Sequence, residues 1–133
     1  MALEGAAKSV LKDASRVVVF SEDGTVLYSD FQADPSELKT LAVVFVERDA
    51  AIRTGMMVGG TRYEVHRFHP PAVYGRTMGG TPETSEGAAV YKVDVGTSGG
   101  PAYCFITYQM PNISARMVPL LTTFCNEHLA AKS

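Results

Sequence analysis

Few residues of this 133-residue chain have the types and spacing that chemistry at a site requires. His66 and His69 stand close together, but two imidazoles without a third ligand nearby are a weak signal for zinc. Segment 96–100 reads Gly-Thr-Ser-Gly-Gly, which would hold a phosphate only if a helix followed it. Residues 102–108 instead have the composition of a strand, so we expect a turn at 96–100, surface histidines, no metal and no cofactor.

The two cysteines, Cys104 and Cys125, also lack the surroundings of reactive thiols. A reactive thiolate needs an electropositive neighbourhood, and no basic residue is adjacent to either cysteine in the sequence. We expect two reduced, buried thiols, and the spacing alone leaves a disulfide open. The sequence contains no GxSxG, P-loop, HExxH or paired CxxC motif. The residues themselves therefore give no sign of an enzyme.

Composition narrows the class of partner. The chain is 46% hydrophobic and 20% charged with a net charge of −2, as in a soluble globular protein. Its one positive segment, 55–82, holds Arg62, Arg67 and Arg76 against Glu64 alone. This charge is too small for a nucleic-acid domain, and it indicates either a patch for an acidic partner or a solvated strand face. Without a membrane-length apolar run or signal peptide, we expect a cytoplasmic protein.

Hydrophobic periodicity predicts one α+β domain over residues 1–133. The predicted helices are 2–14, 34–53 and 112–131, and the predicted strands are a hairpin at 16–31 and segments 56–58, 61–68, 72–78, 88–95 and 102–109. A sheet of five to seven antiparallel strands with helices on its faces would bury these apolar strands.

Start and stop signals support the helices. Asp34 is a good N-cap, and Pro35 suits the first helical position. Ser114 can cap the closing helix. Pro119 lies awkwardly inside that helix, so the helix either bends there or starts nearer Val118.

Glycine and proline mark the turns. Glycine pairs at 59–60, 79–80 and 99–100 are evenly spaced, as expected for a meander of hairpins. His69-Pro70-Pro71 predicts another turn, because proline has no main-chain donor for a central strand. The polar segment 79–87 predicts a flexible loop.

Alternation along strand 61–68 divides its side chains between two faces. Tyr63 and Val65 point to one face. The other face carries a mixed set, namely Arg62, Glu64, His66 and Phe68. The next strand is predicted to place Tyr74, Arg76 and Met78 on a shared face. Such mixed surfaces are typical of protein interfaces, although helices could equally cover the apolar members.

Four segments carry a resemblance to a known family. Residues 56–65 read Met-Met-Val-Gly-Gly-Thr-Arg-Tyr-Glu-Val, and residues 71–76 read Pro-Ala-Val-Tyr-Gly-Arg. Residues 21–26 form the Asp-Gly hairpin, and residues 34–38 begin a helix as Asp-Pro-Ser-Glu-Leu. Together with the element order over residues 16–131, these segments resemble the profilin family.

The resemblance implies a profilin-like fold in which the N- and C-terminal helices pack on one face of the sheet and a further helix packs on the other. It also implies a small cytoplasmic protein that binds monomeric actin and regulates the cytoskeleton. The contact would use the late strands and the start of the C-terminal helix. The residues expected to bind the partner are the charges Arg62, Arg76 and Arg116 and the apolar anchors Phe68 and Tyr74.

Departures from the family pattern limit other ligands. The chain has no Trp, and Phe124 is the one aromatic residue of the predicted closing helix. Aromatic faces bind polyproline helices, so the sequence argues against proline-rich ligands. The basic run that profilins often carry is reduced to Arg76, which argues against phosphoinositides.

Two alternatives remain open. The roadblock dynein light chains have a similar element order, which would imply a dimeric scaffold with a partner other than actin. Such a dimer would form through helix 34–53 or a sheet edge. A small-ligand sensor with a pocket over the sheet has less support, because no convergent set of polar residues marks a ligand site.

Overall fold

The computed structural model describes residues 3–77, 85–97, 99–109 and 112–131, and it confirms the predicted α+β class. The elements in chain order are α1 (Leu3–Val10), β1 (Arg16–Ser21), β2 (Val26–Ser29), α2 (Pro35–Val43), α3 (Arg48–Thr54), β3 (Met56–Val58), β4 (Thr61–His69), β5 (Ala72–Thr77), β6 (Gly87–Val93), β7 (Ala102–Tyr108), α4 (Ser114–Phe124) and the π-helical turn η1 (Cys125–Leu129).

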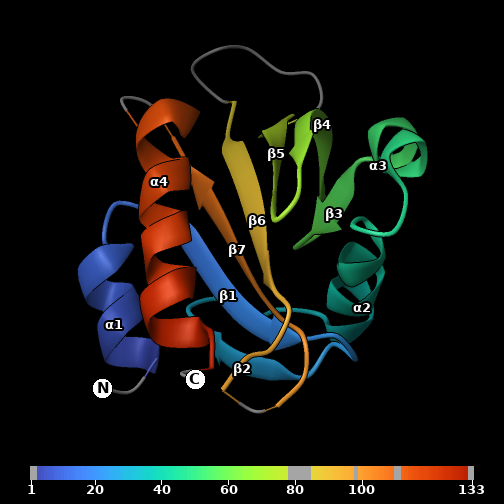
Figure 1. Ribbon diagram of the computed structural model, residues 1–133. Helices are drawn as coiled ribbons and strands as arrows, with labels where there is room; N and C mark the ends of the chain where they lie inside the picture. The colour runs from blue at the N-terminus through green and yellow to red at the C-terminus, as the bar shows by residue number, and fades with distance from the viewer. Residues whose placement is uncertain (1–2, 78–84, 98, 110–111, 132–133) are drawn as a thin grey trace.

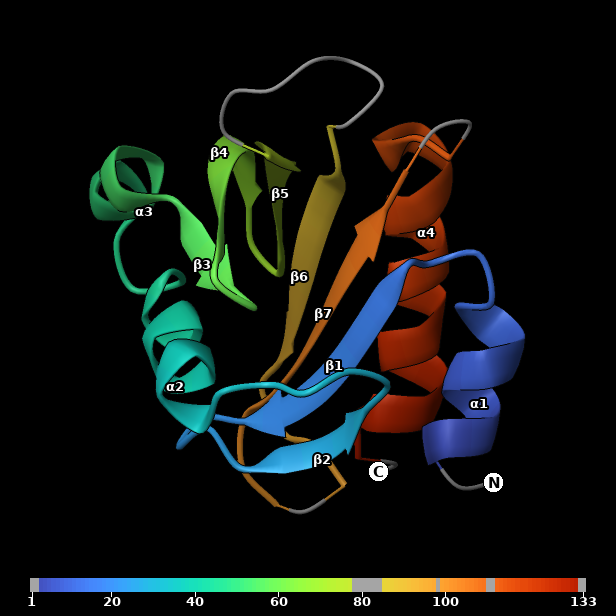
Figure 2. The same ribbon diagram turned by 180° about the vertical axis from the view of Figure 1, so that it is seen from behind.

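The strands form one antiparallel, seven-stranded sheet in the order β2-β1-β7-β6-β5-β4-β3. Helices α1 and α4 lie side by side on one face, and α2 and α3 lie on the other (Figures 1 and 2). This is the predicted placement of the helices. None of the described helices is long and apolar enough to cross a membrane.

Two apolar layers hold the helices to the sheet. On β1, Val17 and Val19 pack in the layer beneath α1 and α4, whereas Val18 and Phe20 pack in the layer beneath α2. All four side chains are buried. A strand covered on both faces must be apolar at successive positions, which explains the Val-Val-Val-Phe run.

The predicted helix 34–53 is wrong in one respect, because it is two helices separated by residues 44–47. Asp34 caps α2 as predicted, accepting from the Ser36 amide at 2.9 Å. Glu47 has extended backbone and caps α3, accepting from the amides of Asp49 at 2.8 Å and Ala50 at 2.9 Å. A second N-cap inside the segment ends the first helix and starts another.

The two terminal helices also differ from prediction. Helix α1 ends at Val10, and the segment up to residue 14 forms turns. Helix α4 starts at Ser114 and continues through Pro119. Its N-cap position is Ile113, and no side chain caps it. The Ser114 hydroxyl instead lies 2.6 Å from the hydroxyl of Tyr108, so the expected Ser114 cap is wrong.

The turns largely follow the glycines. Gly24 closes the β1–β2 hairpin with φ of 91°. Gly59 and Gly60 close the β3–β4 hairpin with φ of 63° and 78°, the positive values that a two-residue type I′ turn requires. The predicted Gly79–Gly80 turn and most of the predicted 79–87 loop lie outside the described residues.

Candidate partner-binding surface

A β-bulge in β4 decides which side chains share a face. Val65 pairs with Gly75 of β5, but the next paired residue is Arg67, opposite Tyr74. His66 is therefore the extra residue, and the alternation of side chains shifts after it. Phe68 consequently packs half-buried in the apolar layer beneath α2 and α3. The predicted grouping of Phe68 with Arg62, Glu64 and His66 is wrong for this reason.

The bulge also brings a missed residue into the candidate surface. Arg67 is exposed and lies directly opposite the half-buried Tyr74. Arg76 lies opposite Glu64, whose carboxylate is 3.1 Å from the His66 imidazole. We call these five residues the β4–β5 strip. The spacing of the apolar residues Tyr63, Val65 and Phe68 is a sequence signal for this bulge. The first two are two residues apart, as in a regular strand, but Phe68 follows after three residues.

Arg76 joins the strip to the start of α4. Its Nε donates to the Ser85 hydroxyl at 3.0 Å. Burial raises the pKa of the Tyr108 hydroxyl, and the Ser114 hydrogen bond and the nearby positive charge of Arg76 oppose that shift. Arg76 pairs with Gly87 of β6, and Gly87 pairs with Tyr108 of β7. Tyr74, Arg76, Tyr108 and Ser114 therefore form one neighbourhood that reaches from β5 across β6 to β7 and the first turn of α4.

Glycine makes room for this corner. Gly87 pairs with Tyr108, and a Cβ atom on Gly87 would lie only 2.2 Å from a Tyr108 ring carbon. The phenol ring therefore lies directly over Gly87, which holds its hydroxyl against Ser114.

Two predicted charges are already engaged elsewhere. Arg116 donates to the Asn112 side chain at 2.7 Å and forms an ion pair with Asp13 after α1. The Arg116 hydrogen bond lowers the pKa of the exposed Asp13 carboxyl. Arg62 donates from Nε to the Thr54 carbonyl at 2.9 Å, so its guanidinium is directed to the end of α3. The structure thus brings together Tyr74 and Arg76 but holds Arg62 and Arg116 in separate contacts.

The cysteines, segment 96–100 and the histidines were the other candidates for chemistry. Cys104 and Cys125 are free and buried, and burial raises the pKa of the Cys125 thiol. The segment around 96–100 connects β6 to β7, as the strand composition of 102–108 predicts. His66 and His69 are exposed. Within the described residues, no three His, Cys, Asp or Glu side chains are grouped to hold a metal ion.

Helices α1 and α4 expose no Phe, Tyr or Trp among their described residues. The described α1 contains none of these residues, and Phe124 of α4 is fully buried. Phe124 therefore supports the core and offers no aromatic face to a ligand.

Comparison with known proteins identifies the family. The profilin family model matches residues 6–95, which is more than half of the chain, so the chain belongs to the profilin family. Profilin from Schizosaccharomyces pombe is similar in fold, with a TM-score of 0.75 and 17% identity over 95% of this chain and 94% of that one. Acanthamoeba castellanii profilin IA gives a TM-score of 0.74 and 14% identity over the same shares of the two chains.

A third similar structure contains a bound partner. LokiProfilin2, solved in complex with rabbit actin, gives a TM-score of 0.72 and 13% identity over 94% of this chain and 93% of that one. At such identities the likeness concerns the fold. No curated protein matches the chain.

Proposed function

We propose that this profilin binds monomeric actin through the β4–β5 strip and the adjacent start of α4. The main observation in support is the shared fold with LokiProfilin1 and LokiProfilin2, both solved in complexes with rabbit actin. In this proposal the protein acts as a binding protein that controls the supply of actin monomers to the cytoskeleton.

The chemistry of the strip suits a protein partner. Arg67 and Arg76 give a local positive charge on a chain whose net charge is −2. Such a patch attracts an acidic surface and speeds encounter, and the effect weakens as salt screens it. Tyr74 is half-buried between them and offers an aromatic anchor with a polar end.

The roles of the other predicted residues follow from their contacts. Arg116 orders the corner between α1 and α4 through Asp13, and we assign it a positioning role there. Phe68 packs on the other side of the sheet, in the layer beneath α2 and α3. We propose that proline-rich ligands do not bind, since α1 and α4 expose no Phe, Tyr or Trp among their described residues.

Charge reversal tests this surface. We expect Arg67→Glu and Arg76→Glu each to weaken the binding of labelled monomeric actin by about tenfold, a loss of about 1.4 kcal/mol. Arg48→Glu makes the same charge change on α3, beneath the opposite face of the sheet, and it should leave the affinity unchanged. Equal losses in all three variants would show an effect of net charge and would contradict the assigned surface.

A further inference from the structure

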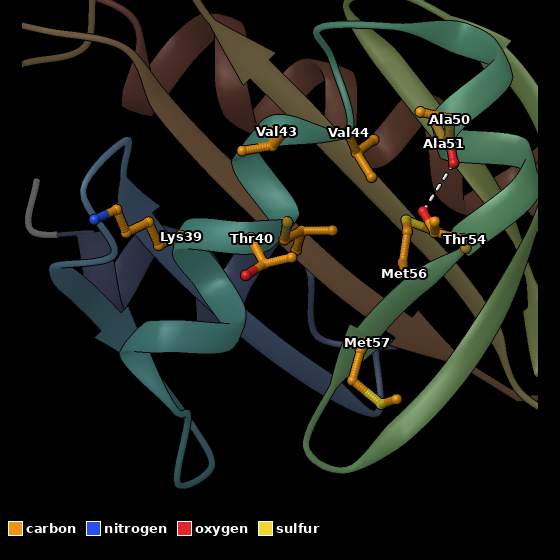
Figure 3. A pocket seen from close by; sticks show the side chains of 11 residues that line it. Lys39, Thr40, Val43, Val44, Ala50, Ala51, Thr54, Met56 and Met57 are labelled. Atoms are coloured by element: carbon orange, nitrogen blue, oxygen red, sulfur yellow. Dashed lines mark hydrogen bonds between the residues drawn. The ribbon is translucent and has the colours of Figure 1, made fainter.

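An apolar groove lies beside the free edge of the sheet, away from the β4–β5 strip. It has a volume of about 490 Å³ and lies between α2 and β3, with α3 at one end (Figure 3). Its apolar walls are formed by Leu41, Val43, Val44, Ala51 and Met56, among others. Volume and lining match those of sites that bind apolar groups.

The two threonine hydroxyls of the groove already form hydrogen bonds within their own helices. The Thr40 hydroxyl donates to the Ser36 carbonyl at 3.0 Å, and the Thr54 hydroxyl donates to the Ala50 carbonyl at 2.8 Å. Lys39 is the one charged residue of the lining, and its amine points away from the side chain of Met56 (Figure 3). The lining side chains therefore give no anchor for a charged head group.

The main chain of β3 supplies the polar recognition instead. Strand β3 is the last strand of the sheet, and a two-residue turn joins it to β4. Val58 and Thr61 flank this turn and form a hydrogen-bonded pair, so the next pair, Met57 with Arg62, is a non-hydrogen-bonded pair. The N–H and C=O of Met57 therefore point away from β4, toward the groove, and no other described segment bonds them.

An extended peptide can use the apolar groove and the free main-chain groups of Met57 at the same time. Its main chain can exchange two hydrogen bonds with Met57, while an alternate side chain enters the apolar groove. Glu37 holds the β3–β4 turn against α2 by accepting from the amides of Gly59 at 2.8 Å and Gly60 at 3.2 Å, which fixes the two walls. Val43, which is 59% exposed, lies on the α2 wall, where it is available to a ligand.

We propose that this groove binds an extended segment of a partner protein that carries a large apolar side chain and adds to the edge of β3. The site uses residues other than those of the actin-binding surface, so it stands whether or not actin binds. Because β3 offers a single free residue to pair with, most of the affinity comes from the side chain in the groove, and binding is weak.

Blocked heptapeptides in which Thr alternates with Leu, Met or Phe test the proposal. With ¹⁵N-labelled protein, we expect at least one peptide at about 1 mM to shift the amide signals of Met57 and Thr54 in a saturable way. Val43→Lys should weaken this binding about tenfold. Val46→Lys is the matched control, because Val46 is 78% exposed but does not line the groove, and it should bind as the wild type does.

Backbone-methylated peptides separate strand addition from simple apolar capture. N-methylation of the central residues removes the peptide donors but keeps the apolar side chains, and we expect it to weaken binding about tenfold. Equal binding of the methylated peptides, or no shifts with any of the three sequences, would overturn the proposal. A dimer in sedimentation that Val43→Lys dissolves would overturn it as well, because a second copy would then fill the groove.

Discussion

The Arg116–Asp13 ion pair links the first turn of α4 to the segment after α1. The Arg116 hydrogen bond lowers the Asp13 pKa in the folded protein, so the carboxylate contributes stability above its unfolded pKa. That contribution is lost as the pH falls through the lower, folded pKa. The pair is partly exposed, so its main effect is to hold the two segments in register.

Replacing Arg116 tests this assignment directly. In Arg116→Gln we expect the Asp13 pKa to rise toward its ordinary value, measured by carboxyl NMR titration. Asp23 is the internal control, because hydrogen bonds from Ser21 and Thr25 lower its pKa to about 2 and Arg116 takes no part. An unchanged Asp13 pKa would show that the ion pair does not form in solution.

Gly87 provides a second test at the residue scale. A Cβ atom there would lie 2.2 Å from the buried Tyr108 ring, so Gly87→Ala must displace the ring and its hydrogen bond to Ser114. We expect the free energy of unfolding to fall by about 1–3 kcal/mol in urea denaturation. Gly100→Ala is the matched control, since a Cβ atom at Gly100 meets no atom within 4 Å. Equal stability of the two variants would contradict this packing.

At the scale of elements, the bulge in β4 has the largest consequence. It allows Tyr63, Val65 and Phe68 to face the same apolar layer although their spacing is uneven. It also turns His66 and Arg67 outward beside Tyr74. A regular strand of the same sequence would meet neither demand, because it would turn Arg67 toward the apolar layer and Phe68 away from it.

Deleting His66 therefore should be much less harmful than deleting a paired residue of β4. Without His66 the strand alternates strictly, so Phe68 stays in the apolar layer and Arg67 stays on the exposed face. Deleting Glu64 instead makes Tyr63 and Val65 neighbours in the chain, so one of them must leave the apolar layer. We expect the free energy of unfolding to fall by about 1–3 kcal/mol in the Glu64 deletion and by less than about 1 kcal/mol in the His66 deletion. Urea unfolding of both variants measures the difference, and equal losses would show that His66 is not the extra residue of the strand.

Much of the fold could be predicted from local signals. Strands β3 and β4, the β1–β2 turn at Gly24 and the Asp34 cap follow from alternation, positive φ and capping chemistry. The break before α3 was missed because Glu47 is an unusual capping residue within an apolar run. Ser114 was misassigned because its hydroxyl bonds across to Tyr108, a contact between distant elements.

The candidate surface was harder to predict than the fold. Tyr74 and Arg76 were expected on one face, and they lie in the same neighbourhood near Tyr108. Arg67 was missed as a surface residue and Phe68 was placed wrongly, because the register of β4 against β5 is a property of the pair of strands. The engagement of Arg116 with Asp13 depends on how α1 and α4 pack, which no local pattern encodes.

On the scale of the whole molecule, buried tyrosines make the free energy of unfolding depend on pH in the alkaline range. Burial, followed by the charge of Glu22, raises the pKa of Tyr103 to about 12, and burial also raises the pKa of Tyr63 and of Tyr108. A raised folded pKa means that the folded state holds its proton more tightly than the unfolded state. The stabilisation is therefore complete below the unfolded pKa of about 10 and is lost as the pH rises through the folded values.

We expect the free energy of unfolding to be steady to about pH 10 and to fall between about pH 10 and 12. Urea denaturation across this range, with tyrosinate absorbance recorded in parallel, measures the loss. Tyr103→Phe removes one of the titrating groups and should make the decline shallower. A decline equally steep in this variant would assign the effect to other groups.

The proposed binding of monomeric actin by this member of the profilin family is tested most directly by titrating labelled monomeric actin with the purified protein. Fluorescence anisotropy should show saturable binding with a micromolar dissociation constant that weakens from low to moderate salt, because the β4–β5 strip is charged. Absence of binding up to high micromolar protein at low salt would contradict the proposed role in actin binding.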